Sequence, residues 1–147
     1  MKLVRRLILF ISLAVVILSL TGNTDLPKLP LVKEPAKNFF TGLAGENKQI
    51  LVVKIDDTNA AHPQIGVESA DVVYVEQVEG GLTRLAAIYT SKLPPLIGPI
   101  RSARISDIEL LAQFGRVGFA YSGAQSKMRP VIAAANLENL SAERNPP

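Results

Sequence analysis

The segment QILVVKIDD, residues 49–57, decides the fold of this chain. Its first seven residues form a run rich in β-branched and other apolar side chains, which predicts a buried β-strand. The strand ends in the polar cluster DDTN at residues 56–59. Because α/β domains usually bind ligands at the carboxyl ends of their strands, this junction is also a candidate site.

Strand-like and helix-like segments alternate after residue 57. Segments with strand composition lie at residues 71–76, 82–90 and 116–121, and the second of these is expected to run antiparallel to the first. Segments with helical character lie at residues 102–114 and 123–136. This alternation predicts an α/β fold, a layered single domain with a mixed sheet and flanking helices.

The first 22 residues have the pattern of an export signal or short membrane anchor. Lys2, Arg5 and Arg6 precede an apolar run over residues 7–20. As a helix at ~1.5 Å per residue, residues 3–20 would span about 27 Å, close to the thickness of a bilayer core. The basic end should stay in the cytoplasm, so we expect a protein of the cell membrane whose domain lies on the extracytoplasmic face.

The end of this segment leaves two alternatives open. Residues 20–22 (LTG) have the form that precedes the lipidated cysteine of a bacterial lipoprotein, but Asn23 follows and the chain has no cysteine. Either residues 1–22 remain as an uncleaved anchor, or a signal peptidase cuts near Gly22. We expect retention, because no Ala-x-Ala cleavage site is present.

Composition limits the partners and cofactors. The first 22 residues carry three of the 16 basic residues and none of the 13 acidic ones, so the rest of the chain is formally neutral. This balance argues against nucleic acid as a partner. With no cysteine and His62 as the only histidine, we expect no cofactor unless carboxylates hold Mg²⁺ or Ca²⁺.

Residues 23–38 are rich in proline and lysine, which predicts an extended spacer between the membrane segment and the domain. The domain is expected over residues 39–147, long enough for one core.

Two acidic motifs are candidate polar sites, each with a structural alternative. Asp56 and Asp57 could hold a cation or act as acid and base, or Asp57 could cap a turn. Glu76 and Glu79 precede two glycines and Arg84, and glycines of this kind either allow a close approach to a ligand or simply form a hairpin.

Arg101, Ser102 and Arg104 form the strongest candidate site, for an anion. Cations in the first turn of a helix oppose its dipole unless an anion lies between them, and Arg84 could contribute to the same site. The alternative is local pairing, such as Arg104 with Asp107.

Ser122 lies between a predicted strand and the helix after it. No Gly-x-Ser-x-Gly motif surrounds it, so it is better interpreted as a helix N-cap or a hydrogen-bond donor to a ligand than as a nucleophile.

Seven motifs of this chain together resemble the YerB-like family of bacterial cell-envelope proteins, which are usually lipoproteins of unknown function. They lie at residues 41–43, 52–57, 61–64, 70–74, 78–84, 97–104 and 121–123. The chain differs in carrying Asn23 where members usually have the lipidated cysteine. Members also usually continue into a second domain, so the resemblance implies an N-terminal domain that is incomplete here.

Three functions remain open from sequence. The domain could bind an anionic envelope component, such as a phosphate-bearing glycan or lipid carrier. It could be a metal-assisted hydrolase or transferase of envelope phosphodiesters or pyrophosphates. It could also be a protein-interaction module whose charges pair internally.

Overall fold

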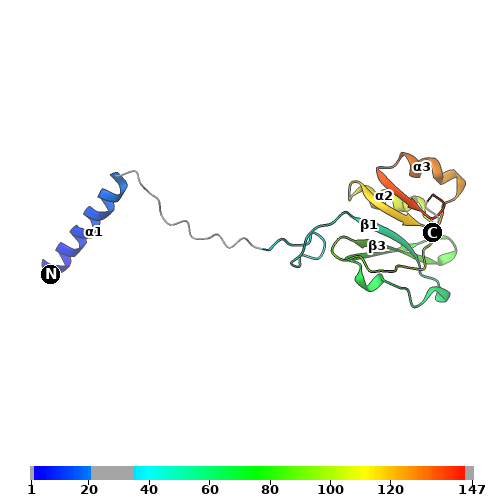
Figure 1. The fold of residues 1–147 in the computed structure, drawn as a ribbon, viewed down its shortest axis with the longest axis horizontal. Helices are drawn as coiled ribbons and strands as arrows, with labels where there is room; N and C mark the ends of the chain where they lie inside the picture. Colours follow the sequence, from blue (N-terminus) through cyan, green and yellow to red (C-terminus); the bar gives the residue numbers. More distant parts are fainter. Residues whose placement is uncertain (1, 21–34, 145–147) are drawn as a thin grey trace. The chain divides into compact units, whose positions relative to one another are not determined.

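The structure is a computed structural model that describes residues 2–20 and 35–144 (Figure 1). The chain divides into two compact units, and the boundary in the sequence falls between residues 34 and 35. In the first unit, Lys2–Leu20 form helix α1, so the helix expected from the apolar run is present. Within the described part of the chain, none of the helices combines the length and the hydropathy needed to cross a bilayer. Most of the predicted spacer, up to residue 34, lies outside the described residues.

The second unit contains a five-stranded mixed sheet with the strand order β2-β3-β1-β4-β5. The strands are β1 (Leu51–Asp56), β2 (Val72–Gln77), β3 (Thr83–Tyr89), β4 (Val117–Tyr121) and β5 (Leu137–Ser141). Strand β3 runs antiparallel to both β2 and β1, whereas β4 runs parallel to both β1 and β5. The α/β class and the mixed sheet predicted from the sequence are therefore confirmed.

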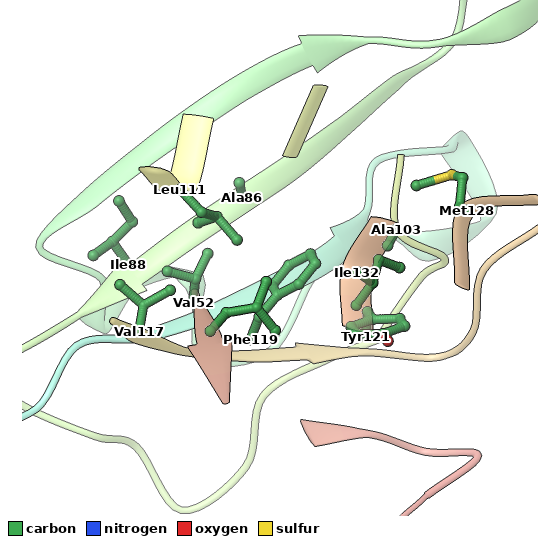
Figure 2. Close-up of a cluster of buried hydrophobic side chains, with 11 residues drawn as sticks. Val52, Ala86, Ile88, Ala103, Leu111, Val117, Phe119, Tyr121, Met128 and Ile132 are labelled. Atoms are coloured by element: carbon green, nitrogen blue, oxygen red, sulfur yellow. The ribbon is translucent and has the colours of Figure 1, made fainter. Parts of the chain in front are cut away.

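The helices of this unit are short, and they cover one face of the sheet. They are α2 (Ile105–Ala112) and α3 (Arg129–Ala134). The unit also contains the 3-10 turns η1 (Asn59–Ala61), η2 (Val67–Ser69), η3 (Glu79–Gly81) and η4 (Ser126–Met128), of which η2 packs on the opposite face through Val67. Leu111 of α2 and Ile132 of α3 pack with Val52 and Phe119 in the larger core cluster (Figure 2). Burying each of these side chains contributes about 1.5–3 kcal/mol to folding. The opposite face carries a smaller apolar cluster centred on β1 and β3.

An extended segment separates β1 from β4 at their carboxyl ends. The parallel pairing of the two strands ends at Val53 and Ala120. Beyond that point Arg101 N–H donates to the carbonyl of Lys54 at 2.8 Å, and Ser122 N–H donates to the carbonyl of Arg101 at 3.0 Å. The residues around Arg101 are thus held between two diverging strands, at the edge where α/β sheets commonly bind ligands.

Both predicted helices are shorter than the sequence pattern suggested. The helix expected over 102–114 begins only at Ile105, because the backbone before it is used in hydrogen bonds to β1 and to the residues just after β4. The helix expected over 123–136 is reduced to η4 and α3, with proline in the first turn of α3. No element was predicted from the sequence after residue 136, where strand β5 completes the sheet.

The domain begins before the predicted boundary. Asn38, assigned to the spacer, is only 2% exposed. Its side-chain Nδ2 donates to Thr90 Oγ1 at 2.9 Å, and its Oδ1 accepts the backbone N–H groups of Phe40 and Thr41, each at 3.0 Å. Asn38 therefore fixes the entry of the chain into the domain.

Candidate functional site

Charged side chains gather at the carboxyl end of β1, on the face covered by α2. In the sheet register Arg84 of β3 lies opposite Asp56 of β1 on one side and Glu76 of β2 on the other. Arg101 and Arg104 come from the chain leading into α2. We refer to Arg84, Arg101 and Arg104 as the arginine cluster.

Arg101 is the most accessible member of this cluster. Its Nε lies 3.2 Å from Asp56 Oδ2, and its side chain is 48% exposed. Its two Nη groups make no hydrogen bond to any described residue, so donors remain for a ligand. The structure thus brings Asp56 and Arg101, two separate sequence candidates, into one pair.

Arg104 makes more hydrogen bonds within the protein than Arg101 does. Its Nε donates to Glu79 Oε2 at 2.8 Å, and its Nη1 donates to the carbonyl of Ala103 at 3.0 Å. The hydrogen bond from Arg104 lowers the pKa of Glu79. The local ion pair suggested between Arg104 and Asp107 is absent, because Asp107 instead accepts the backbone N–H of Arg104 at 2.5 Å, at the start of α2.

Arg84 has no ion pair with any described residue. Its Nη1 donates to the carbonyl of Ser102 at 2.7 Å. Burial lowers its pKa, and the neighbouring charges of Arg104 and Arg101 lower it further. Near Arg84, repulsion from the other two guanidiniums therefore exceeds the attraction of the nearest carboxylates.

The hydroxyl groups of Ser102 and Ser122 lie close together, with their Oγ atoms 3.4 Å apart, and only the backbones of these serines contact the arginine cluster: Ser122 N–H donates to the carbonyl of Arg101, and the carbonyl of Ser102 accepts from Arg84. Ser102 was predicted to lie in the first turn of the helix, but α2 begins three residues later, at Ile105. Ser122 does not cap a helix either, since the next turn, η4, starts at Ser126. Ser102 lies in the segment between β1 and β4, and Ser122 lies at the bend after β4; both hydroxyls can act as donors or acceptors.

A buried ion triad beneath the cluster was missed from the sequence. Lys54 Nζ lies 2.6 Å from Glu76 Oε1 and 2.6 Å from Asp107 Oδ1, and the Lys54 side chain is fully buried. Ser106 Oγ also donates to Glu76 Oε2, at 2.8 Å. The available signal was a lysine inside an otherwise apolar strand, because a charge facing a core requires partners of opposite sign.

The two carboxylates of this triad have opposite pKa shifts. Burial raises the pKa of Asp107 to about 6, and the charge of Lys54 only partly offsets this effect. Burial alone would also raise the pKa of Glu76, but its hydrogen bond to Lys54 and the charge of that lysine outweigh it, so the pKa is lowered.

Asp57 lies apart from this cluster. Thr83 Oγ1 donates to its Oδ2 at 2.5 Å, Gln64 Nε2 donates to its Oδ1 at 3.0 Å, and His62 Nε2 lies 3.3 Å away. The predicted turn chemistry belongs instead to Asp56, whose Oδ1 accepts the backbone N–H of Thr58 at 3.1 Å.

The two glycines after Glu79 form the connection of the β2–β3 hairpin. Gly80 and Gly81 have φ values of +73° and +74°, which L side chains rarely adopt. The hairpin alternative therefore accounts for the glycine pair. Across the described residues, no group of three or more histidine or carboxylate side chains is placed to hold a metal ion.

Comparisons with known proteins identify the family. Residues 40–146 match the family described as "Protein of unknown function (DUF3048) N-terminal domain". The chain is 36% identical over 80 residues to "Putative lipoprotein YerB" of Bacillus subtilis (strain 168), an alignment covering 52% of this chain and 24% of that protein.

The crystal structure of the YerB protein from Bacillus subtilis has the same fold. It matches with a TM-score of 0.66 at 30% identity, covering 74% of this chain and 39% of that one. The chain thus spans well under half the length of YerB. The resemblance drawn from the sequence motifs is confirmed, and the chain belongs to the DUF3048 N-terminal domain family, whose molecular function is unknown.

Proposed function

We propose that this domain lies on the extracytoplasmic side of the cell membrane and binds an anionic envelope component at the arginine cluster. The observation that carries the proposal is the half-exposed Arg101, whose Nη groups have no partner in the described residues, beside Arg84, which has no ion pair there. Guanidiniums form strong, often bidentate hydrogen bonds to phosphate oxygens, so a phosphate-bearing glycan or lipid carrier fits this chemistry.

The extracytoplasmic location is supported by α1 and by the relative. Helix α1 has three basic residues near its start and then an apolar run interrupted only by Ser12 and Ser19, the order found in export segments. YerB carries the name of a lipoprotein, whereas Asn23 cannot receive a lipid here, so attachment would depend on α1 itself. Cell fractionation tests this: an intact chain in the membrane fraction supports an anchor, and a released form without α1 supports cleavage.

Isothermal titration of the full chain with inorganic pyrophosphate tests the anion site. Arg101→Gln should weaken binding by about tenfold or more, because a charge-assisted hydrogen bond contributes about 1.5–3 kcal/mol. Arg129→Gln is the matched control, since Arg129 is an exposed arginine paired with Glu143 and its loss changes net charge equally. Equal binding by the wild type and Arg101→Gln would contradict the proposal.

Asp56 provides a sharper test, because it competes with any anion for Arg101. Asp56→Asn removes that competition and retains an acceptor for the N–H of Thr58. We therefore expect Asp56→Asn to bind pyrophosphate several-fold more tightly than the wild type. Weaker pyrophosphate binding by Asp56→Asn would mean that Asp56 helps to hold Arg101 for the anion, and would contradict the idea that Asp56 competes with it.

The interaction-module alternative is favoured by the internal pairing of Arg104 with Glu79 and of Arg101 with Asp56. It predicts no pyrophosphate binding by the wild type. The hydrolase alternative receives less support, because Asp56 and Asp57 have separate partners and do not converge on one cation.

A further inference from the structure

A groove lies at the other end of β1, on the face of the sheet opposite α2 and α3. Its floor is a row of residues paired across four strands, with Leu51 between Tyr89 and Gly118, and Gly118 beside Glu138. Leu51 and Tyr89 belong to the smaller apolar cluster. The groove has a volume of about 610 Å³, within the range of pockets that hold small molecules.

The missing side chain of Gly118 helps to keep this groove open. A Cβ at that position would lie 3.1 Å from Leu140 Cδ1 and 3.6 Å from Leu51 Cδ1. Leu140 and Leu93 also line the groove and are 38% and 58% exposed. The floor therefore offers apolar carbon to solvent, which a hydrocarbon chain could cover favourably.

The rim of the groove is positively charged. Lys48, Lys92 and Arg116 line it, and Glu138 is the one acidic residue among the lining side chains. Glu138 pairs with Arg116 at 2.7 Å, and both side chains are more than half exposed. Lys48 and Lys92 make no ion pair with any described residue, so two positive charges remain available beside an apolar floor.

We propose that this groove binds a single-chain anionic amphiphile, such as an alkyl phosphate. The hydrocarbon chain lies over Leu51, Leu93 and Leu140, and the anionic head contacts Lys48 and Lys92. Apolar surface supplies most of the affinity, and the cationic rim selects for a negative head group. This site is separate from the arginine cluster and does not depend on its function.

Photolabelling of the full chain tests the proposal. The protein is held in phosphatidylcholine nanodiscs and exposed to a dodecyl phosphate that carries a diazirine in its chain. Mass spectrometry then locates the adducts. We expect adducts on peptides containing Leu51, Leu93 or Leu140, and fewer from the uncharged dodecanol analogue. Adducts confined to α1, or equal labelling of the groove by both probes, would overturn the proposal.

Variants separate the roles of floor and rim. Leu93→Glu places a carboxylate at an exposed loop position that lines the groove, where it should not disturb folding, and it should reduce groove labelling by about tenfold. The double variant Lys48→Gln/Lys92→Gln should reduce labelling about three- to tenfold. A control pair, Lys127→Gln/Arg129→Gln, removes the same charge outside the groove and should label like the wild type.

Arg101→Gln should also label normally, which distinguishes failure of this proposal from failure of the anion site. If Leu93→Glu leaves the groove labelling unchanged, the hydrocarbon chain of the ligand does not lie in this groove, and the inference is refuted.

Discussion

The buried triad of Lys54, Glu76 and Asp107 predicts an unusual dependence of stability on pH. Asp107 is fully buried, and burial raises its pKa from 3.8 to about 6. Between these two values the folded state holds a proton that the unfolded state has released. The folded state therefore binds more protons, so the free energy of unfolding should rise as the pH falls through this window.

The size of this change in stability follows from the pKa shift of Asp107. A pKa change of about two units corresponds to roughly 3 kcal/mol, a cost that is fully present above about pH 6 and relieved near pH 4. Glu76 acts in the opposite direction. Its pKa is lowered from 4.5, so its stabilising contribution is lost only as the pH falls below that value. Stability should therefore increase between about pH 7 and pH 5 and then decrease in stronger acid.

Urea unfolding of the full chain followed by tyrosine fluorescence measures this effect, because the chain has three tyrosines and all lie in the domain. Asp107→Asn retains an acceptor for the N–H of Arg104 but does not titrate. We expect the rise in stability on mild acidification to disappear in this variant. Glu138→Gln, which changes an exposed carboxylate, should retain it. An equal rise in Asp107→Asn and the wild type would refute the reasoning.

Three further substitutions test the packing by the same unfolding measurement. Lys54→Met leaves the buried Asp107 and the partly buried Glu76 without their counter-ion and should lower stability by about 3–5 kcal/mol; a neutral effect would contradict the triad. Asn38→Ala removes the side-chain hydrogen bond to Thr90 and should lower the free energy of unfolding by about 1–3 kcal/mol. An unchanged free energy of unfolding would show that Asn38 does not contribute to the domain and would support the predicted boundary at residue 39. Gly66→Ala should cost more than Gly80→Ala. Both positions have positive φ, but only at Gly66 would the new Cβ meet a backbone oxygen, at 2.5 Å, so equal costs would count against this clash.

Strands β1 to β4 were predictable because their signal is local, whereas β5 was missed. The apolar run at 49–55 and the strand-like segment at 71–76 each matched an observed strand to within two residues. The start of α2 was not predictable in this way. Residues 102–104 continue the helical spacing of residues 105–112, but the backbone of residues 101–103 bonds to β1 and to residues 122–123, partners that are distant in sequence.

In the candidate site, too, single residues could be identified from the sequence, but contacts between residues far apart in the sequence could not. Asp56 and Arg101 were each identifiable as charges at element ends, yet their pairing depends on how residues 99–103 enter between two strands. Glu79 and Arg104 are 25 residues apart, and no local spacing connects them. Lys54 did carry a local signal, because it interrupts an apolar strand, but its partners come from two other elements.

The register of the β2–β3 hairpin determines whether the arginine cluster exists. Side chains alternate between faces along a strand, so a slip of one residue in β3 would move Arg84 to the opposite face, away from Arg101. Gly80 and Gly81, both at positive φ, allow the tight connection that sets this register. The same register places Glu76 within reach of Lys54, and a slip would leave that buried ammonium with one carboxylate fewer. The buried triad therefore penalises the slipped register, and in doing so it maintains the positions of the arginine cluster.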